Sequence, residues 1–253
     1  MSKPPVRRFA LLRAGGVAGL PTRFLARFLA RLPTRFLARL MPGVRRQLSD
    51  IPVVILVLVV LCVVPEALLS GADFKLWGGA HWRGIAYGLG GFWPGLLHDW
   101  RPNYRGQALV MFASYGFLHG GPVHLVVNMM SLVSLGRAVV ERAGPGRFLM
   151  IYGAALLGGG LGFGVLANTV QPMVGASGAL FGLVGALVAW GLRERLEVGE
   201  TLWPVARALI WLVALNLILW VATAGSLAWQ THLGGFLAGA ALAWALEVWA
   251  PEG

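Results

Sequence analysis

Charged residues are scarce in this sequence. Asp, Glu, Lys and Arg make up 12% of its 253 residues, against about 25% in an ordinary soluble domain. Hydrophobic residues make up 57%, and the mean hydropathy is +0.72. So few charges cannot cover the surface of a soluble protein, and so apolar a chain is not typical of disorder. The single cysteine, Cys62, excludes intrachain disulfide bonds and a cysteine-rich metal site. The composition therefore predicts a polytopic membrane protein.

The charges that are present gather near the N-terminus. Residues 1–50 hold eleven of the 21 Lys and Arg residues and one of the ten acids. A twelve-residue repeat there spaces arginines every four residues, along one helical face. This basic segment would lie on an anionic lipid surface, or it is a poorly ordered leader that only sets the topology. Its length and the lack of a small-residue cleavage site argue against a secretory signal peptide. We expect a basic cytoplasmic arm over 1–50, a membrane domain over 51–250, and no nucleic acid partner.

Six apolar segments are each long enough to cross about 30 Å of hydrocarbon. They lie near residues 51–70, 122–141, 147–167, 175–192, 204–223 and 231–249. Six spans put both termini on one side of the membrane, and the basic arm places that side in the cytoplasm. The first outside loop, about 71–110, is rich in Trp and Gly and too long for a simple connector. We expect it to rest in the membrane interface, with a merely folded-back loop as the alternative.

Three of the six spans carry strongly polar residues at one depth. Near the outer end of the second span, His124 and Asn128 lie one helical turn apart. Ser177 lies at the outer start of the fourth span, and His232 at the outer start of the sixth. Polar side chains inside a span are costly, and residues that serve only packing would scatter over all the spans. The shared depth predicts a single site.

The residue types at this depth suit nucleophilic catalysis. A serine hydroxyl needs an adjacent base, and His232 could serve Ser177 if the fourth and sixth spans approach closely. The glycines that would permit this approach are Gly178, Gly182, Gly235 and Gly239. Asn128, His124 and the N–H of Ser177 could stabilise an oxyanion. Since no acid lies near this level in the fourth or sixth span, we expect a Ser–His dyad.

Other chemistries fit the sequence less well. A membrane metalloprotease would need His-Glu-x-x-His, which is absent. His119, His124 and His232 could in principle bind zinc, but no acid or cysteine stands nearby, so no metal or cofactor is expected. An aspartyl protease is excluded because every aspartate lies outside the predicted spans. A channel or transporter would carry its polar groups at mid-membrane.

These polar motifs resemble those of the rhomboid family of intramembrane serine proteases, in its bacterial six-span type. The matching stretches are residues 119–128, 175–182 and 232–239, in the same order along the chain. The resemblance covers roughly residues 108–249 and implies an all-α bundle of six transmembrane helices with a long interfacial first loop. One departure is the Trp-Arg pair that family members commonly carry shortly before the second span. Here the nearest pairs are Trp82-Arg83 and Trp100-Arg101.

The resemblance also implies roles for individual residues. Ser177 would be the nucleophile, His232 the general base, and His124 and Asn128 the oxyanion donors, with Phe181 packed on the ring of His232. Substrates would be transmembrane segments of other membrane proteins, cut near the outer face of a bacterial inner membrane. The alternative is a rhomboid-like protein that binds transmembrane helices without cutting them. Such proteins typically lose the serine or the histidine, and both are present here.

Overall fold

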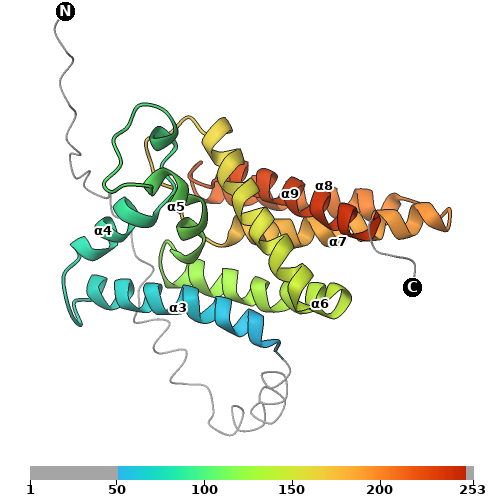
Figure 1. The fold of residues 1–253 in the computed structure, drawn as a ribbon, viewed down its shortest axis with the longest axis horizontal. Coiled ribbons are helices and arrows are strands. Elements are labelled where there is room, and N and C mark those ends of the chain that lie inside the picture. The colour runs from blue at the N-terminus through green and yellow to red at the C-terminus, as the bar shows by residue number, and fades with distance from the viewer. Residues whose placement is uncertain (1–50, 249–253) are drawn as a thin grey trace, which may run out of the picture. The chain divides into compact units, whose positions relative to one another are not determined.

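The computed structural model describes residues 51–248, and the predicted basic arm of residues 1–50 lies outside these described residues. The secondary-structure elements of the described part of the chain are helices joined by loops (Figure 1). Its helices are α3 (Val53–Asp73), α4 (His81–Gly90), α5 (Gln107–Ser114), α6 (Pro122–Leu166), α7 (Ser177–Glu197), α8 (Trp203–Ala222) and α9 (Trp229–Val248), with the 3-10 turns η1 (Pro94–Leu97) and η2 (Tyr115–Phe117). The predicted lipid binding by the arm stays a prediction.

Helix α6 is two helical segments joined at a sharp break. Gly144 has φ of 80° and ψ of 165°, which no helical residue adopts, and Pro145 follows it. Glycine accepts the positive φ, and proline begins the next segment because the first turn of a helix needs no N–H donor there. The two segments correspond to the predicted spans 122–141 and 147–167. Their connection is a single residue, shorter than the sequence indicated.

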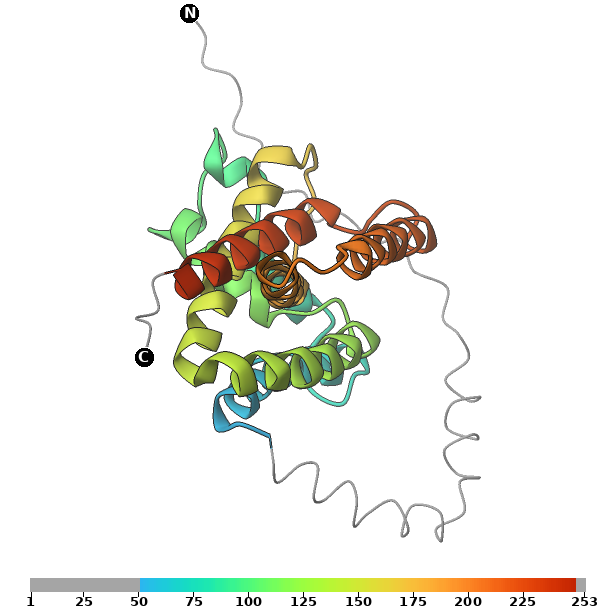
Figure 2. The ribbon, with the colours of Figure 1, turned by 90° about the vertical axis from the view of Figure 1, so that its right-hand side faces the viewer.

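Between residues 51 and 248, six long helical segments make up a polytopic membrane bundle, as the sequence predicted. By length and composition, α3, α6 and α8 are apolar enough to cross a membrane, and α6 contains two of the six segments. Helices α7 and α9 are of similar length and are rich in Gly and Ala. Helix α7 lies in the middle of the bundle, and α9 packs across α7 and α6 (Figure 2).

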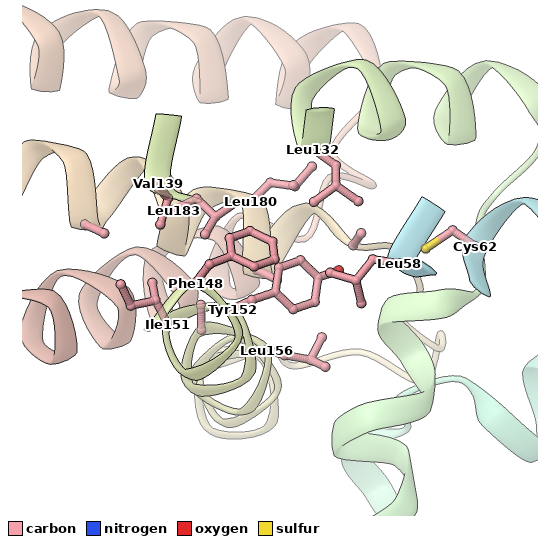
Figure 3. Packing of buried hydrophobic residues seen from close by; sticks show 14 of the residues in the cluster. Leu58, Cys62, Leu132, Val139, Phe148, Ile151, Tyr152, Leu156, Leu180 and Leu183 are labelled. Atoms are coloured by element: carbon pink, nitrogen blue, oxygen red, sulfur yellow. The ribbon is translucent and has the colours of Figure 1, made fainter. Parts of the chain in front are cut away.

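The core lies where α6, α7 and α9 pack against one another. Figure 3 shows side chains from both segments of α6 meeting those of α7, with α3 alongside. The labelled residues of this core are Leu58, Cys62, Leu132, Val139, Phe148, Ile151, Tyr152, Leu156, Leu180 and Leu183. Helix α8, in contrast, has no buried residue and lies beside the bundle (Figure 2).

An ionic cluster joins the same three helices at the end of α7 that is remote from Ser177. Arg142 in α6 pairs with Glu194 in α7 and with Glu247 in α9. Its guanidinium also lies over the ring of Trp190, 4.8 Å from the centroid. These contacts close one end of the α6–α7–α9 core, and the polar site occupies the other.

Candidate active site

Ser177 is the first residue of α7, and the loop before it is held from two sides. Phe92 and Met173 form an isolated antiparallel bridge with two backbone hydrogen bonds of 2.9 Å. The N–H of Gly175 donates to the carbonyl oxygen of Tyr115 at 2.9 Å. Gly175 itself has φ of 130°, a conformation that residues with a Cβ rarely adopt. These contacts fix the backbone of the loop and thereby hold Ser177 at the first position of α7.

The structure brings Ser177 and His232 together across the α7–α9 contact. Ser177 Oγ lies 2.9 Å from His232 Nε2, within hydrogen-bonding distance. Phe181, one turn after Ser177, stacks on the imidazole, with ring centroids 4.0 Å apart and planes at 3°. His232 is 5% exposed. Stacking on one face and burial together hold the imidazole in one orientation toward the serine.

The predicted glycines lie where α7 and α9 approach most closely. A Cβ atom added to Gly235 would lie 1.9 Å from the carbonyl oxygen of Gly178, and one added to Gly239 would lie 2.1 Å from that of Gly182. Real side chains never approach backbone this closely, so only glycine allows this separation of the two helices. The small residues thereby set the distance between the elements that carry Ser177 and His232.

His124 and Asn128 lie in the first turns of α6 and face the loop before Ser177. The N–H of Gly120 donates to His124 Nδ1 at 3.1 Å, so the neutral imidazole carries its proton on Nε2. A Cβ atom on Gly175 would lie 3.0 Å from that Nε2 and 3.7 Å from Asn128 Nδ2. Asn128 is 5% exposed, and its Nδ2 has no hydrogen-bond partner within residues 51–248. Two N–H donors therefore converge on the backbone two residues before Ser177.

A buried ion pair anchors the first loop beside this site. Arg83, in the Trp82-Arg83 pair of α4, donates to both carboxylate oxygens of Glu66 at 2.8 and 2.9 Å. Arg83 Nη1 also donates to the carbonyl oxygen of His119 at 2.9 Å, and so does the hydroxyl of Tyr87 at 2.6 Å. The network ties α3 and α4 to the residues that lead into α6. The Trp82-Arg83 pair, which lies further from the second span than the family pattern would have it, is thus held close to the site by this network.

The ionisation of this anchor follows from its contacts. Burial alone would lower the pKa of Arg83, but hydrogen bonds to Glu66, Tyr87 and Asp73 outweigh burial and raise that pKa above its ordinary value. Burial, together with the nearby His124, lowers the pKa of His119 to about 4. At neutral pH the loop is therefore held by a charged guanidinium beside an uncharged imidazole.

Two polar residues at the site were not singled out from the sequence. Asn216 in α8 places its Oδ1 2.7 Å from His232 Nδ1. Glu66 in α3 is 1% exposed and pairs with Arg83. Each interrupts an apolar helix, and the cost of a polar group inside a span is the signal that could have identified both.

A metal centre receives no support from the described residues. Between residues 51 and 248, no three His, Cys, Asp or Glu side chains are grouped so that they could hold a metal ion. The polar groups present are a hydroxyl beside an imidazole, with N–H donors close by. Such an arrangement is able to activate an alcohol and to stabilise an oxyanion.

Comparison with known proteins points to one family. A family model described as the Rhomboid domain matches residues 106–248. The chain is 36% identical over 122 residues to rhomboid protease GluP of Bacillus subtilis, covering 48% of this chain and 23% of that protein. It is 36% identical over 124 residues to RHOMBOID-like protein 5 of Arabidopsis thaliana, covering 49% and 39%. It is 33% identical over 129 residues to rhomboid-like protease 3 of Toxoplasma gondii, covering 50% and 47%.

The matched region coincides with the helices that build the site. It begins just before α5 and ends with α9, so it contains Ser177, His232, His124 and Asn128. The chain spans less than half the length of each of these relatives. More than half of the chain is matched by the family model, in an all-helical membrane bundle. The chain belongs to the rhomboid family.

Proposed function

We propose that this protein is an intramembrane serine endopeptidase that cleaves transmembrane segments of other membrane proteins with Ser177 and His232. The observation that carries the proposal is the 2.9 Å separation of Ser177 Oγ and His232 Nε2. Membership of a family in which several relatives are named as proteases adds support. Nucleophilic catalysis needs a hydroxyl and a base in direct contact, and this pair meets that condition.

The reaction begins with transfer of the Ser177 hydroxyl proton to His232 Nε2 while Oγ bonds the substrate carbonyl carbon. Collapse of the tetrahedral intermediate breaks the C–N bond, and the amine leaves with the proton from Nε2. A water molecule then attacks the acyl ester and gives its proton to the same nitrogen. When the ester bond breaks, Ser177 recovers that proton and the carboxylic acid product leaves.

His124 and Asn128 stabilise the negative charge that develops on the carbonyl oxygen. The N–H of Ser177, at the first position of α7, has no acceptor within the helix and can add a third donor. The unpartnered Nδ2 of Asn128 supports this role, because a buried amide N–H otherwise loses a hydrogen bond. A preorganised donor of this kind contributes about 3–4 kcal/mol to the transition state.

The site works near the outer face of the bacterial inner membrane, in a multi-pass protein with both termini in the cytoplasm. The charge distribution supports this orientation, since eleven Lys and Arg residues precede α3. Arg142, Arg193 and Arg195 lie at the end of the bundle remote from Ser177. Anionic lipids would contact the basic arm, while substrates reach Ser177 from within the bilayer.

The test is cleavage of a model transmembrane substrate in detergent and in liposomes. Ser177→Ala and His232→Ala are each expected to lower kcat by at least about 1,000-fold. Ser131→Ala alters a half-buried serine of α6 whose hydroxyl donates to the carbonyl oxygen of Val127 one turn back, so it is the matched control and should cleave like the wild type. Thermal unfolding of each variant shows that the fold is kept.

The alternative function is a rhomboid-like protein that binds transmembrane helices without cutting them. A serine-directed fluorophosphonate distinguishes the two, because it labels a serine only where a base activates that serine. Labelling that disappears in Ser177→Ala supports the protease. A folded wild type that takes up no label and cuts no substrate overturns the proposal in favour of the binder. A Ser177→Ala variant that cuts normally overturns the assignment of Ser177 as the nucleophile.

A further inference from the structure

Asn216 is a strongly polar residue in an apolar part of α8. Its neighbours from 210 to 220 are Ile, Leu, Val, Ala and Trp, and no residue of α8 is buried. An amide inside a span is costly unless both of its ends find partners. Here both do: Nδ2 donates to the carbonyl oxygen of Leu212 at 3.0 Å, and Oδ1 lies 2.7 Å from His232 Nδ1.

The contact with Leu212 determines which end of the amide faces the histidine. A carbonyl oxygen only accepts hydrogen bonds, so the NH2 end of Asn216 must lie against it. The oxygen end is then the one that faces His232, and an amide oxygen also only accepts. The proton between the two side chains therefore belongs to His232 Nδ1.

This proton position determines the state of the other imidazole nitrogen. A neutral imidazole has one N–H, so a proton on Nδ1 leaves Nε2 with a free lone pair. Nε2 is the nitrogen that lies 2.9 Å from Ser177 Oγ. The opposite tautomer would present an N–H to the serine and could not remove its proton. Asn216 thus favours the one tautomer in which His232 can act as a base.

We infer that Asn216 is a positioning residue that orients His232 and selects its reactive tautomer, which makes the dyad a Ser–His–Asn arrangement. The inference rests on the proposed function, because that function makes His232 the base that Asn216 would position. An asparagine fills the same role in proteases with a Cys-His-Asn site. When His232 gains the serine proton it becomes a cation, and the Asn216 oxygen then stabilises the charge through the same hydrogen bond. Asn216 does not contact the reacting atoms.

Kinetics provide the first test. Asn216→Leu removes the acceptor and should lower kcat by about 10- to 100-fold, the effect of one hydrogen bond to a group that becomes charged. KM should stay within about twofold, because the side chain does not contact the substrate. Asn216→Asp keeps an oxygen acceptor at the same position and should restore most of the turnover. Val213→Leu, on an exposed face of α8, is the control for changes in this helix.

The second test reads the tautomer directly and needs no cleavage. Nitrogen-15 NMR spectra of histidine-labelled protein distinguish a proton on Nδ1 from one on Nε2, and comparison with His232→Ala assigns the signals of His232. The wild type should show the proton on Nδ1, and Asn216→Leu should show a mixture of the two tautomers. The spectrum of the wild type alone tests the inference if Asn216→Leu does not fold.

The outcomes separate the two proposals. A wild-type His232 protonated on Nε2, an Asn216→Leu variant with normal kcat, or equal losses in Asn216→Leu and Asn216→Asp would overturn the role of Asn216. A Ser177→Ala variant that still cuts would overturn the proposed function instead, and the tautomer of His232 could still be measured. A loss in Asn216→Leu that appears in KM alone would assign Asn216 to substrate binding and also overturn the inference.

Discussion

Replacement of Gly235 by alanine tests whether the α7–α9 contact holds the site together. The added Cβ would lie 1.9 Å from the carbonyl oxygen of Gly178, and the Gly178 carbonyl carbon and Cα would also be within 3.2 Å. Close C···O contacts in proteins are about 3.3 Å, so the two helices would have to separate by about 1.4 Å. Neither side can yield locally, because the atoms in contact belong to helical backbone.

The size of the effect follows from two opposing contributions. Overpacking of this kind lowers the free energy of unfolding by about 3 kcal/mol, which is the upper end of the usual range for overpacked cores, because whole helices must move. Alanine in place of glycine within a helix stabilises by about 1 kcal/mol. The net loss of about 2 kcal/mol lowers the midpoint of thermal unfolding by about 4–8 °C for a bundle of this size. The same separation would carry Ser177 Oγ beyond hydrogen-bonding distance of His232 Nε2, so cleavage should fall at least about tenfold.

Gly191→Ala is the matched control for this substitution. Gly191 lies in α7 and a Cβ atom there would have no neighbour within 4 Å, so only the gain in helix propensity remains. We expect Gly191→Ala to raise the unfolding midpoint by about 2–4 °C and to leave cleavage unchanged. Both variants are compared by thermal unfolding and by cleavage in the same detergent. If Gly235→Ala were as stable and as active as Gly191→Ala, α7 and α9 could not lie as close as described.

Two further predictions concern the anchor of the first loop. Arg83→Met leaves the carboxylate of Glu66 buried without its ion-pair partner and should lower the free energy of unfolding by about 3 kcal/mol. The double variant Arg83→Met with Glu66→Gln should recover part of this loss. An unchanged unfolding midpoint in Arg83→Met would contradict the buried pair. The pKa of His119 is about 4 in the folded protein and 6.5 when unperturbed, so its contribution to stability is complete above pH 6.5 and is lost as pH falls toward 4. Between pH 6.5 and 5 the unfolding midpoint of the wild type should therefore fall more than that of His119→Leu, and parallel curves would show that another group is responsible.

The helices, and the common level of Ser177 and His232 along the bundle, could be predicted from the sequence because both depend on local patterns. Apolar runs near 20 residues are direct consequences of the thickness of the bilayer. Ser177 and His232 both lie near the start of a helix. Alternate spans run in the same direction, so the fourth and sixth spans begin at the same level of the bundle. The break of α6 could be located near Gly144, but its length could not, because a single residue with positive φ suffices to reverse the helix direction.

The contacts of Asn216 and Glu66 could not be predicted in the same way. Each residue along a helix is rotated by about 100° from the last, so the side that Asn216 presents depends on how α8 is turned beside α9. The residues on either side of Asn216 are apolar in every direction around the helix, so they do not encode that rotation. The partner of Glu66 depends on the path of the loop between α3 and α5, and only that path brings Arg83 to it.

Two different supports hold His232, and they should respond differently to substitution. Helices α7 and α9 meet backbone to backbone through Gly235 and Gly239, so their separation is part of the core and changes there affect stability and cleavage together. Asn216 reaches the same imidazole from α8, which contributes no buried residue to the core. Leucine at this position suits a membrane helix better than asparagine does, so Asn216→Leu should lower turnover without lowering the unfolding midpoint. A variant that loses activity while keeping or gaining stability is the pattern expected of a polar residue retained for the chemistry of the site rather than for the fold.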